Sequence, residues 1–348
     1  MNKKTGIILI GLTVLLVVIM ILSSCIGAVK ITFPELFSIL ANKTGLSDVQ
    51  NYRSQQAAVL FNIRLPRVML GVLIGAGLGI SGAAIQGLFR NPLAEPGLIG
   101  ISSGATLFAV LMIVLEIGVF KMLKGTLGFY SLSIAAFTGA CLTTIIIYRL
   151  SMKNGKTVTS TLLLVGIAIN ALTGSITGLL TYMATDEQLR TITFWSLGSL
   201  GGASWETVTG LLPFIAIPVF GLPFLAKSLN VFALGDAQAL HMGIDVKIIK
   251  RSIILLATMA VGASVAVAGM IGFIGLVIPH VIRMAFTADH RLVIPGSAIL
   301  GAALLTLADL TARTIVAPAE LPIGILTALI GTPVFLYIII TERNKNKL

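Results

Sequence analysis

Charged residues are scarce in this sequence, and acidic ones are scarcer than basic ones: 11% of its 348 residues are charged, with 24 Lys and Arg against 13 Asp and Glu. The two cysteines, Cys25 and Cys141, both stand in apolar segments and are too few for a disulfide framework or a cysteine metal site. The three histidines, His241, His280 and His290, are scattered and form no HExxH pattern. Neither a catalytic centre nor a resident cofactor or metal is therefore predicted, and we do not expect an enzyme.

Motifs for binding nucleotides and nucleic acids are lacking as well. Asn154-Gly-Lys-Thr157 resembles the end of a phosphate-binding loop, but such a loop needs a glycine where this chain has Leu150. The formal net charge of +11 comes from basic residues dispersed over short loops, without the interleaved aromatic residues of a nucleic-acid surface. The chain is therefore predicted neither to hydrolyse ATP nor to bind nucleic acid.

Hydrophobic residues are what the chain has in abundance. They make up 56% of the sequence, and the mean hydropathy is +1.02, well outside the range of soluble domains. Because the hydrocarbon core of a membrane holds no water, every backbone N–H and C=O must be paired within its segment, so long apolar runs should be helices. The fold class is predicted to be all-α, as a single transmembrane domain over residues 1–348.

The apolar runs predict ten membrane-spanning segments. They lie near residues 6–28, 65–88, 97–118, 129–150, 158–183, 205–226, 248–272, 274–288, 293–317 and 322–341. The interval between Arg251 and Arg283 holds 31 residues without a formal charge, whereas one span needs about 20. Glycines and Pro279 interrupt this interval, so we expect one full helix followed by a half-length helix.

An even number of spans places both ends of the chain on one side of the membrane. Both ends are basic, with Lys3 and Lys4 at the start and Arg343 and Lys345 near the end, so the positive-inside rule makes them cytoplasmic. Leu22-Ser-Ser-Cys25 could instead end a lipoprotein signal, but nine further spans favour an uncleaved first helix. Membrane lipid is therefore an expected partner of this multi-pass chain.

Glycine patterns within the spans indicate how the helices pack. Gly71, Gly75 and Gly79 recur every four residues, so they share one helix face and allow another backbone to approach closely. This glycine-rich second span ends in a proline-bounded turn, and the glycine-rich seventh span leads to Pro279 and the short eighth. The two would cross in opposite directions, which is typical of an inverted repeat around a central pathway.

The longest polar interruption on the predicted cytoplasmic side, residues 227–247, holds two short amphipathic patterns. The first is formed by Leu229, Phe232 and Ala233, the second by Ala237, Leu240 and His241, and Gly235 stands between them. We expect two small surface helices joined by a hinge. A pair of interfacial helices lying on lipid is the alternative.

Five long motifs are spread over the chain. They are Arg90-Asn-Pro-Leu-Ala-Glu-Pro-Gly-Leu-Ile-Gly-Ile-Ser-Ser-Gly104, the run from Thr193 to Trp205, Gly275-Leu-Val-Ile-Pro-His-Val-Ile-Arg283, Asp289-His-Arg291 and Pro318-Ala-Glu-Leu-Pro-Ile-Gly324. Together they resemble the permease subunits of ATP-binding-cassette (ABC) importers for iron complexes and cobalamin. The resemblance spans nearly the whole chain and implies a cobalamin-permease-like fold in the plasma (inner) membrane of a prokaryote.

This resemblance also implies partners and a gate. The partners would be two copies of an ATP-binding cassette subunit, a periplasmic or lipid-anchored substrate-binding protein, and a second copy of this chain. In the resembled family the channel forms between the two copies, and the residues that match its cytoplasmic gate are Asn91, Leu93, Val158, Thr159 and Ser160. Val158 departs from the polar residue expected at its position.

Two further sets of residues match family positions that contact partners. Residues 228–245 match the loop that couples the permease to its ATPase, with Leu229, Phe232, Gly235, Asp236, Ala237, Leu240, His241 and Gly243 as the coupling residues. Arg64, Arg67 and Arg313 match positions where the binding protein docks, and the predicted topology independently places them at outer helix ends. Snorkelling of arginine side chains towards the membrane surface is the alternative for Arg64 and Arg67.

The cargo is expected to be an iron complex. The run over residues 186–205 and the step Pro96-Gly97 resemble haem permeases most, so we rank haem first, a ferric siderophore second and cobalamin third. The alternative function is an ion-coupled secondary transporter, which needs a buried carboxylate along its path. Asp309 is the candidate, but Arg313 lies four residues further on the same helix face and can pair with it.

Overall fold

The computed structural model describes residues 3–46, 51–115, 128–153 and 156–345. Within them, seven helices are long and apolar enough to cross a membrane: α1 (Lys3–Cys25), α4 (Leu65–Phe89), α7 (Ser131–Leu150), α8 (Thr159–Tyr182), α10 (Trp205–Phe224), α13 (Val246–Ala268) and α15 (His290–Ile315). Three further apolar helices are shorter: α5 (Ile101–Val114), α14 (Ile274–Ala285) and the apolar part, Ile323–Tyr337, of α16 (Ile323–Lys345). These helices confirm the predicted all-α fold and the half-length helix after the seventh span.

Short elements connect the apolar helices. They are α2 (Phe33–Lys43), α3 (Ser54–Val59), the π-helical turn η1 (Leu60–Arg64) that runs into α4, the 3-10 turns η2 (Pro96–Ile99) and η3 (Gly128–Tyr130), α9 (Asp186–Leu197), α11 (Ala226–Phe232) and α12 (Asp236–His241). Two two-residue strands, β1 (Met152–Lys153) and β2 (Lys156–Thr157), pair antiparallel between α7 and α8. Helices α2, α3 and α9 were not predicted from the sequence.

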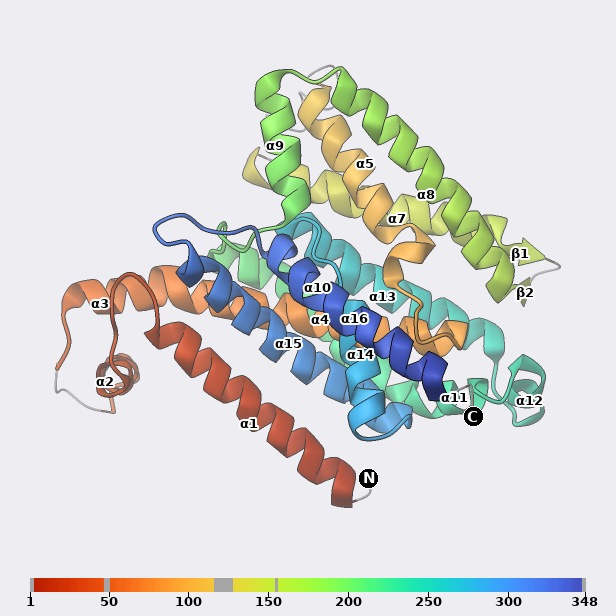
Figure 1. Cartoon of the computed structure of the whole chain (residues 1–348), viewed down its shortest axis with the longest axis horizontal. Helices are drawn as coiled ribbons and strands as arrows, with labels where there is room; N and C mark the ends of the chain where they lie inside the picture. The colour runs from red at the N-terminus through yellow and green to blue at the C-terminus, as the bar shows by residue number, and fades with distance from the viewer. Residues whose placement is uncertain (1–2, 47–50, 116–127, 154–155, 346–348) are drawn as a thin grey trace.

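Helix α4 is the centre of the fold. It is buried without interruption from Gly77 to Phe89, and it packs against α10, α13, α14 and α15. Figure 1 shows both chain termini at one end of the molecule, together with β1, β2, α11 and α12, whereas α2 and α3 lie at the other end. We name these the termini end and the far end.

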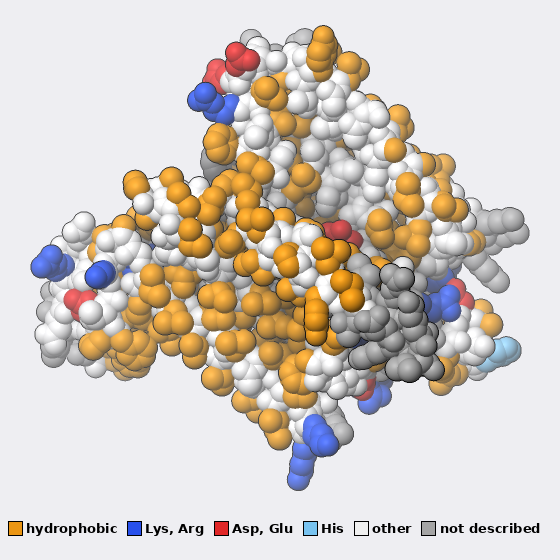
Figure 2. Space-filling view, viewed as in Figure 1, with side chains coloured by type: hydrophobic (Ala, Val, Ile, Leu, Met, Phe, Trp, Pro, Cys, Tyr) orange, Lys and Arg blue, Asp and Glu red, His pale blue; other side chains and the backbone are white. Residues whose placement is uncertain are grey.

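The surface of the molecule is that of a protein embedded in lipid. Large hydrophobic side chains are exposed along α1 and α8, among them Ile7, Ile10, Leu164 and Leu179. Figure 2 shows hydrophobic side chains over the middle of the visible face and most of the Lys, Arg, Asp and Glu side chains at its margins. An apolar band between polar margins is the distribution expected of a multi-pass membrane protein.

Glycines bring the backbones of α4 and α15 into direct contact. A Cβ added to Gly75 would lie 2.3 Å from the carbonyl oxygen of Gly301, and one added to Gly79 would lie 2.2 Å from the carbonyl oxygen of Ser297. Both distances are far shorter than any carbon–oxygen contact in a packed interior. A Cβ added to Gly71 would lie 3.2 Å from the hydroxyl of Thr306, so the same face of α4 follows α15 over two turns.

Two interrupted segments meet against α4. Residues 269–273 separate α13 from α14, and within them Gly269 has a φ of 71° and Phe273 a φ of 67°. A Cβ added to Gly275 at the start of α14 would lie 3.7 Å from Cδ of Pro96, in the interruption between α4 and α5. The breaks after the second and seventh spans are thus neighbours in space, and their relation by an inverted repeat stays a prediction.

Adding a single methyl group at the α4–α15 contact should destabilise the protein. We expect Gly75→Ala to lower stability by about 1–3 kcal/mol, because the methyl group forces the two backbones apart. The measurement is the apparent melting temperature of the purified protein in detergent. Gly11→Ala in α1 is the matched control, since a Cβ there meets no atom within 4 Å. Equal melting temperatures for the two variants would contradict this account of the packing.

Candidate functional site

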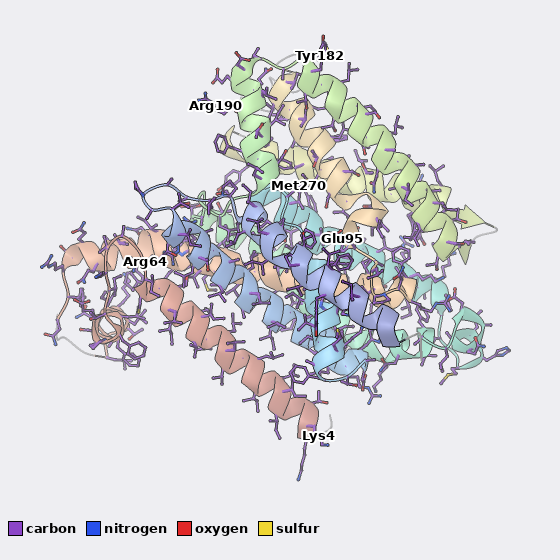
Figure 3. The ribbon with its side chains drawn as sticks, viewed as in Figure 1. Lys4, Arg64, Glu95, Tyr182, Arg190 and Met270 are labelled. Carbon is purple, nitrogen blue, oxygen red and sulfur yellow. The ribbon has the colours of Figure 1, made fainter. Side chains whose placement is uncertain are left out.

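Arg64 at the far end caps another helix. Its side chain is buried, with 4% of the residue exposed, and its Nη1 donates to the carbonyl oxygens of Ser24 at 2.7 Å and Cys25 at 2.9 Å. Its Nη2 donates to the carbonyl oxygen of Val29. These carbonyls include the last ones of α1, which have no partner within their own helix. Figure 3 shows Arg64 where the end of α1 meets the start of α4.

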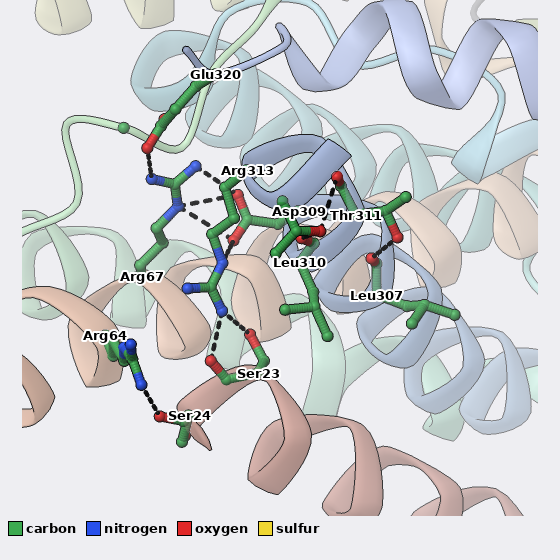
Figure 4. Close-up of polar contacts among 12 residues, drawn as sticks. Ser23, Ser24, Arg64, Arg67, Leu307, Asp309, Leu310, Thr311, Arg313 and Glu320 are labelled. Atoms are coloured by element: carbon green, nitrogen blue, oxygen red, sulfur yellow. Dashed lines mark hydrogen bonds and ion pairs between the residues drawn. The ribbon is translucent and has the colours of Figure 1, made fainter. Parts of the chain in front are cut away.

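An ion-pair cluster lies beside Arg64 and consists of Arg67, Asp309, Glu320 and Arg313 (Figure 4). Arg67 donates from Nε to both carboxylate oxygens of Asp309, at 3.0 and 3.1 Å, and from Nη1 to Oε1 of Glu320 at 2.8 Å. Nε of Arg313 lies 3.7 Å from Oδ2 of Asp309, and its Nη2 donates to the hydroxyl of Ser23 at 2.9 Å. The cluster therefore ties α1, α4, α15 and the loop before α16 together.

The three arginines predicted to dock a binding protein thus all have partners within the chain. The side chains of Arg67 and Arg313 are only 11% and 10% exposed, whereas that of Glu320 is 46% exposed. The sequence spacing predicted the contact between Asp309 and Arg313 but gave no sign of Arg67 or Glu320, which are far from each other along the chain. Docking at these arginines stays a prediction.

At the termini end, the loop over residues 228–245 contains most of α11 and all of α12. Leu229 and Phe232 of α11 are fully buried, so they hold the loop to the helix bundle and do not face a partner. Gly235 precedes α12 with a φ of 117°. The residues of the predicted coupling set that are exposed belong to α12 and the turn after it: Ala237, Leu240, His241 and Gly243.

The two predicted gate segments also lie at the termini end. Arg90 caps the end of α4 with a φ of 50°, and the side chain of Asn91 then accepts a hydrogen bond of 2.9 Å from the N–H of Leu93. The side chain of Leu93 is exposed in the single chain. Val158 precedes α8, and Thr159 and Ser160 begin it, with Ser160 exposed.

Polar residues within the spans make contacts that the sequence analysis missed. Ser103 of α5 donates to the side-chain oxygen of Asn170 in α8 at 2.6 Å, and Asn170 donates to the carbonyl oxygen of Gly97 at 3.1 Å. Gln86 of α4 accepts from Arg283 of α14 and donates to the carbonyl oxygen of Leu276 at 3.0 Å. In each case the sequence shows a polar side chain inside an apolar run, but nothing in the sequence identifies the residue that it contacts.

Metal ligation has no support in the described ranges. Among residues 3–46, 51–115, 128–153 and 156–345, no group of three or more His, Cys, Asp or Glu side chains is placed to hold a metal ion.

Comparison with known proteins places this architecture among transport permeases. The sequence profile of the FecCD transport family matches residues 15–341. The hemin transport system permease protein HmuU of Yersinia pestis is 45% identical over 340 residues, which cover 97% of each chain. The cobalamin import system permease protein BtuC of Halobacterium salinarum is 40% identical over 81% of this chain and 73% of the relative. The vitamin B12 import system permease protein BtuC of Escherichia coli is 36% identical over 88% and 91%.

A solved structure has the same fold along nearly the whole chain. It is described as an inward-facing conformation of a metal-chelate type ABC transporter, and it is 31% identical in sequence. The superposition covers 97% of this chain and 99% of the other, with a TM-score of 0.83.

The ion-pair cluster should make stability depend on pH in the acid range. Its hydrogen bond from Arg67 holds the pKa of Glu320 below the ordinary value. A lowered carboxyl pKa stabilises the fold above the ordinary glutamate pKa of about 4.3 and loses this contribution as the pH falls further. We expect Glu320→Gln to melt below the wild type at pH 7 and the difference to vanish in acid.

The measurement compares apparent melting temperatures across pH for the wild type, Glu320→Gln and Glu187→Gln. Glu187 is an exposed glutamate at the start of α9 and serves as the control. A difference between wild type and Glu320→Gln that stays constant down to the lowest pH would contradict the role given to the pair.

Proposed function

This chain belongs to the FecCD transport family, and we propose that it is the permease of an ABC importer that carries haem into the cytoplasm. A separate ATPase subunit supplies the energy. The observation that carries the haem assignment is the similarity to the hemin permease, which exceeds that to the cobalamin permeases and extends over nearly all of both chains. Ferric siderophores rank second and cobalamin third.

The assembly we propose contains two copies of this chain, two ATPase subunits and a periplasmic or lipid-anchored binding protein. Two features support the ATPase partner: the chain lacks a phosphate-binding loop, and α12 presents an exposed surface that includes Leu240 and His241. The termini end, with both chain termini and the basic loops, then faces the cytoplasm.

The gate we propose lies where the two copies meet at the termini end. Asn91 and Leu93 form one part, and Val158, Thr159 and Ser160 at the start of α8 form the other. The exposed apolar side chain of Leu93, in a turn fixed by the side chain of Asn91, supports a contact with a second copy.

Docking of the binding protein is proposed at the far end, at Arg67 and Arg313, with Arg64 holding the end of α1 against α4. Glu320 is the most exposed member of the cluster and occupies one side of the Arg67 guanidinium. A carboxylate of the binding protein would therefore replace Glu320 on Arg67. Complementary charges of this kind orient partners and speed their association.

An ion-coupled carrier that uses Asp309 has less support. The Asp309 carboxylate accepts two hydrogen bonds from Arg67 and lies within ion-pair distance of Arg313, so both of its oxygens are engaged by cations of its own chain. A proton relay needs a carboxylate that gains and loses its proton readily. The contacts fit a structural ion cluster better.

The proposed function predicts haem uptake that needs ATP and not an ion gradient. The chain, a cognate binding protein and the ATPase are reconstituted in liposomes, and uptake of haem, a ferric siderophore and cobalamin is measured with ATP maintained. We expect haem to be carried fastest, and an uncoupler to leave uptake unchanged. Loss of uptake with the uncoupler would favour the ion-coupled carrier, and preference for another cargo would overturn the haem assignment.

A second prediction concerns the gate between copies. A two-fold axis brings each surface patch against itself, so a cysteine on the axis faces its own copy. Leu93→Cys, with Cys25 and Cys141 replaced, should form a disulfide between copies in the resting state, which requires Cα atoms within about 7 Å. Crosslinking should stop transport and reductant should restore it. A dimeric, active Leu93→Cys protein that never crosslinks would place the axis elsewhere.

A further inference from the structure

Lys250 is a buried cation at the termini end with all three of its donors in use. It lies in the second turn of α13, and only 3% of the residue is exposed. Its Nζ lies 2.6 Å from Oδ2 of Asp236, 2.9 Å from Oγ1 of Thr159 and 3.3 Å from the carbonyl oxygen of Thr157. A lysine ammonium has three N–H donors, so this geometry leaves none of them unpaired.

These partners come from segments that the sequence separates widely. Asp236 is the first residue of α12, inside the loop over residues 228–245. Thr157 and Thr159 flank the start of α8, where one of the two gate segments begins. One ammonium therefore joins the proposed coupling loop to a proposed gate segment.

Asp236 extends the connection to the other gate segment. Its second carboxylate oxygen, Oδ1, lies 3.6 Å from Nη2 of Arg90, at the end of α4. Arg90 directly precedes Asn91, whose side chain fixes the turn that carries Leu93. A displacement of Asp236 would thus act on both gate segments, through Lys250 on one side and Arg90 on the other.

The side chains of Asp236 and Lys250 differ in their exposure to solvent, so a movement would pass from the exposed carboxylate to the buried ammonium. The Asp236 side chain is 40% exposed and lies on a loop at the surface, whereas the Lys250 side chain is 3% exposed. A buried charge that loses its partner is strongly destabilising. When the loop moves, the ammonium must therefore move with the carboxylate and pull on Thr157 and Thr159 through its hydrogen bonds, or else it must restrain the loop.

We propose that Lys250 is a positioning residue that transmits movement of the 228–245 loop to the start of α8. This inference rests on the proposed function, because it takes that loop as the contact with the ATPase. Lys250 does not touch cargo or nucleotide. It keeps Asp236, Thr157 and Thr159 in one hydrogen-bonded unit, so that the loop and the gate segment change position together.

The test uses the whole transporter, with its ATPase and binding protein, in liposomes. The variants are Lys250→Met, Asp236→Asn and the double variant, with Lys250→Arg to retain the charge. Lys247→Gln is the matched control, because Lys247 is an exposed lysine one turn earlier on the same helix. For each, the number of ATP molecules hydrolysed per cargo molecule transported is measured.

We expect Lys250→Met and Asp236→Asn each to raise this ratio about tenfold, a change within the ordinary range of coupling between sites. The double variant should be no worse than Asp236→Asn alone, because Asp236→Asn already removes the ion pair that Lys250→Met removes. Lys250→Arg should recover part of the coupling, and Lys247→Gln should match the wild type. A wild-type ratio in Lys250→Met, or additive effects in the double variant, would overturn the proposal.

A second measurement keeps the test decisive if Lys250→Met assembles poorly. Thr159→Val removes one acceptor of the ammonium and leaves its ion pair intact. In this background, and in the wild type without native cysteines, the alkylation rates of Leu240→Cys on the loop and Ser160→Cys on α8 are compared with and without ATP. Both positions are exposed. We expect ATP to change both rates in the wild type, but only the Leu240→Cys rate in Thr159→Val.

An ATP-dependent change at both positions in Thr159→Val would contradict transmission through Lys250. Failure of the proposed function looks different, because the wild-type transporter itself would then show no ATP-driven uptake.

Discussion

Direct contact between the backbones of α4 and α15 is the constraint on which the rest of the structure depends. In lipid the hydrophobic effect does not draw helices together, so close backbone approach and van der Waals contact must hold them. Gly75 and Gly79 permit that approach, since a side chain at either position would overlap α15. With α4 held at the centre, its two ends place Arg67 in the far-end cluster and Arg90 beside the proposed coupling loop.

The charged groups at the two ends of α4 are arranged differently, and the difference matches the roles proposed for them. At the far end, Asp309 lies buried between Arg67 and Arg313 and joins α4 to α15. At the termini end, buried Lys250 is paired with a carboxylate on an exposed loop. The first arrangement fastens the bundle, and the second connects it to the surface that we propose as the contact with the ATPase.

The predictions from the sequence were most accurate for the membrane-spanning segments, because the membrane determines their length and their lack of charge. The ten apolar helices of the described residues, with the half-length α14 among them, follow from segment length, charge spacing, Pro279 and the glycines near it. Helices α2 and α9 were missed because they are short and amphipathic, and tertiary contacts support them: Leu36 and Ile39 of α2 pack with Leu60. Such contacts between distant segments leave no periodic signal in the sequence.

The sequence by itself determined that the chain is a polytopic helical membrane protein, where its spans are interrupted, and which family its motifs resemble. It also indicated the pairing of Asp309 with Arg313, because residues four apart share a helix face. Only the tertiary structure decided the partners of Arg67, Lys250, Gln86 and Asn170, since some of these contacts join residues as far as 253 positions apart. The physical reason is that a low-dielectric surrounding requires each polar group to find a partner, but helix packing alone selects which segment supplies it.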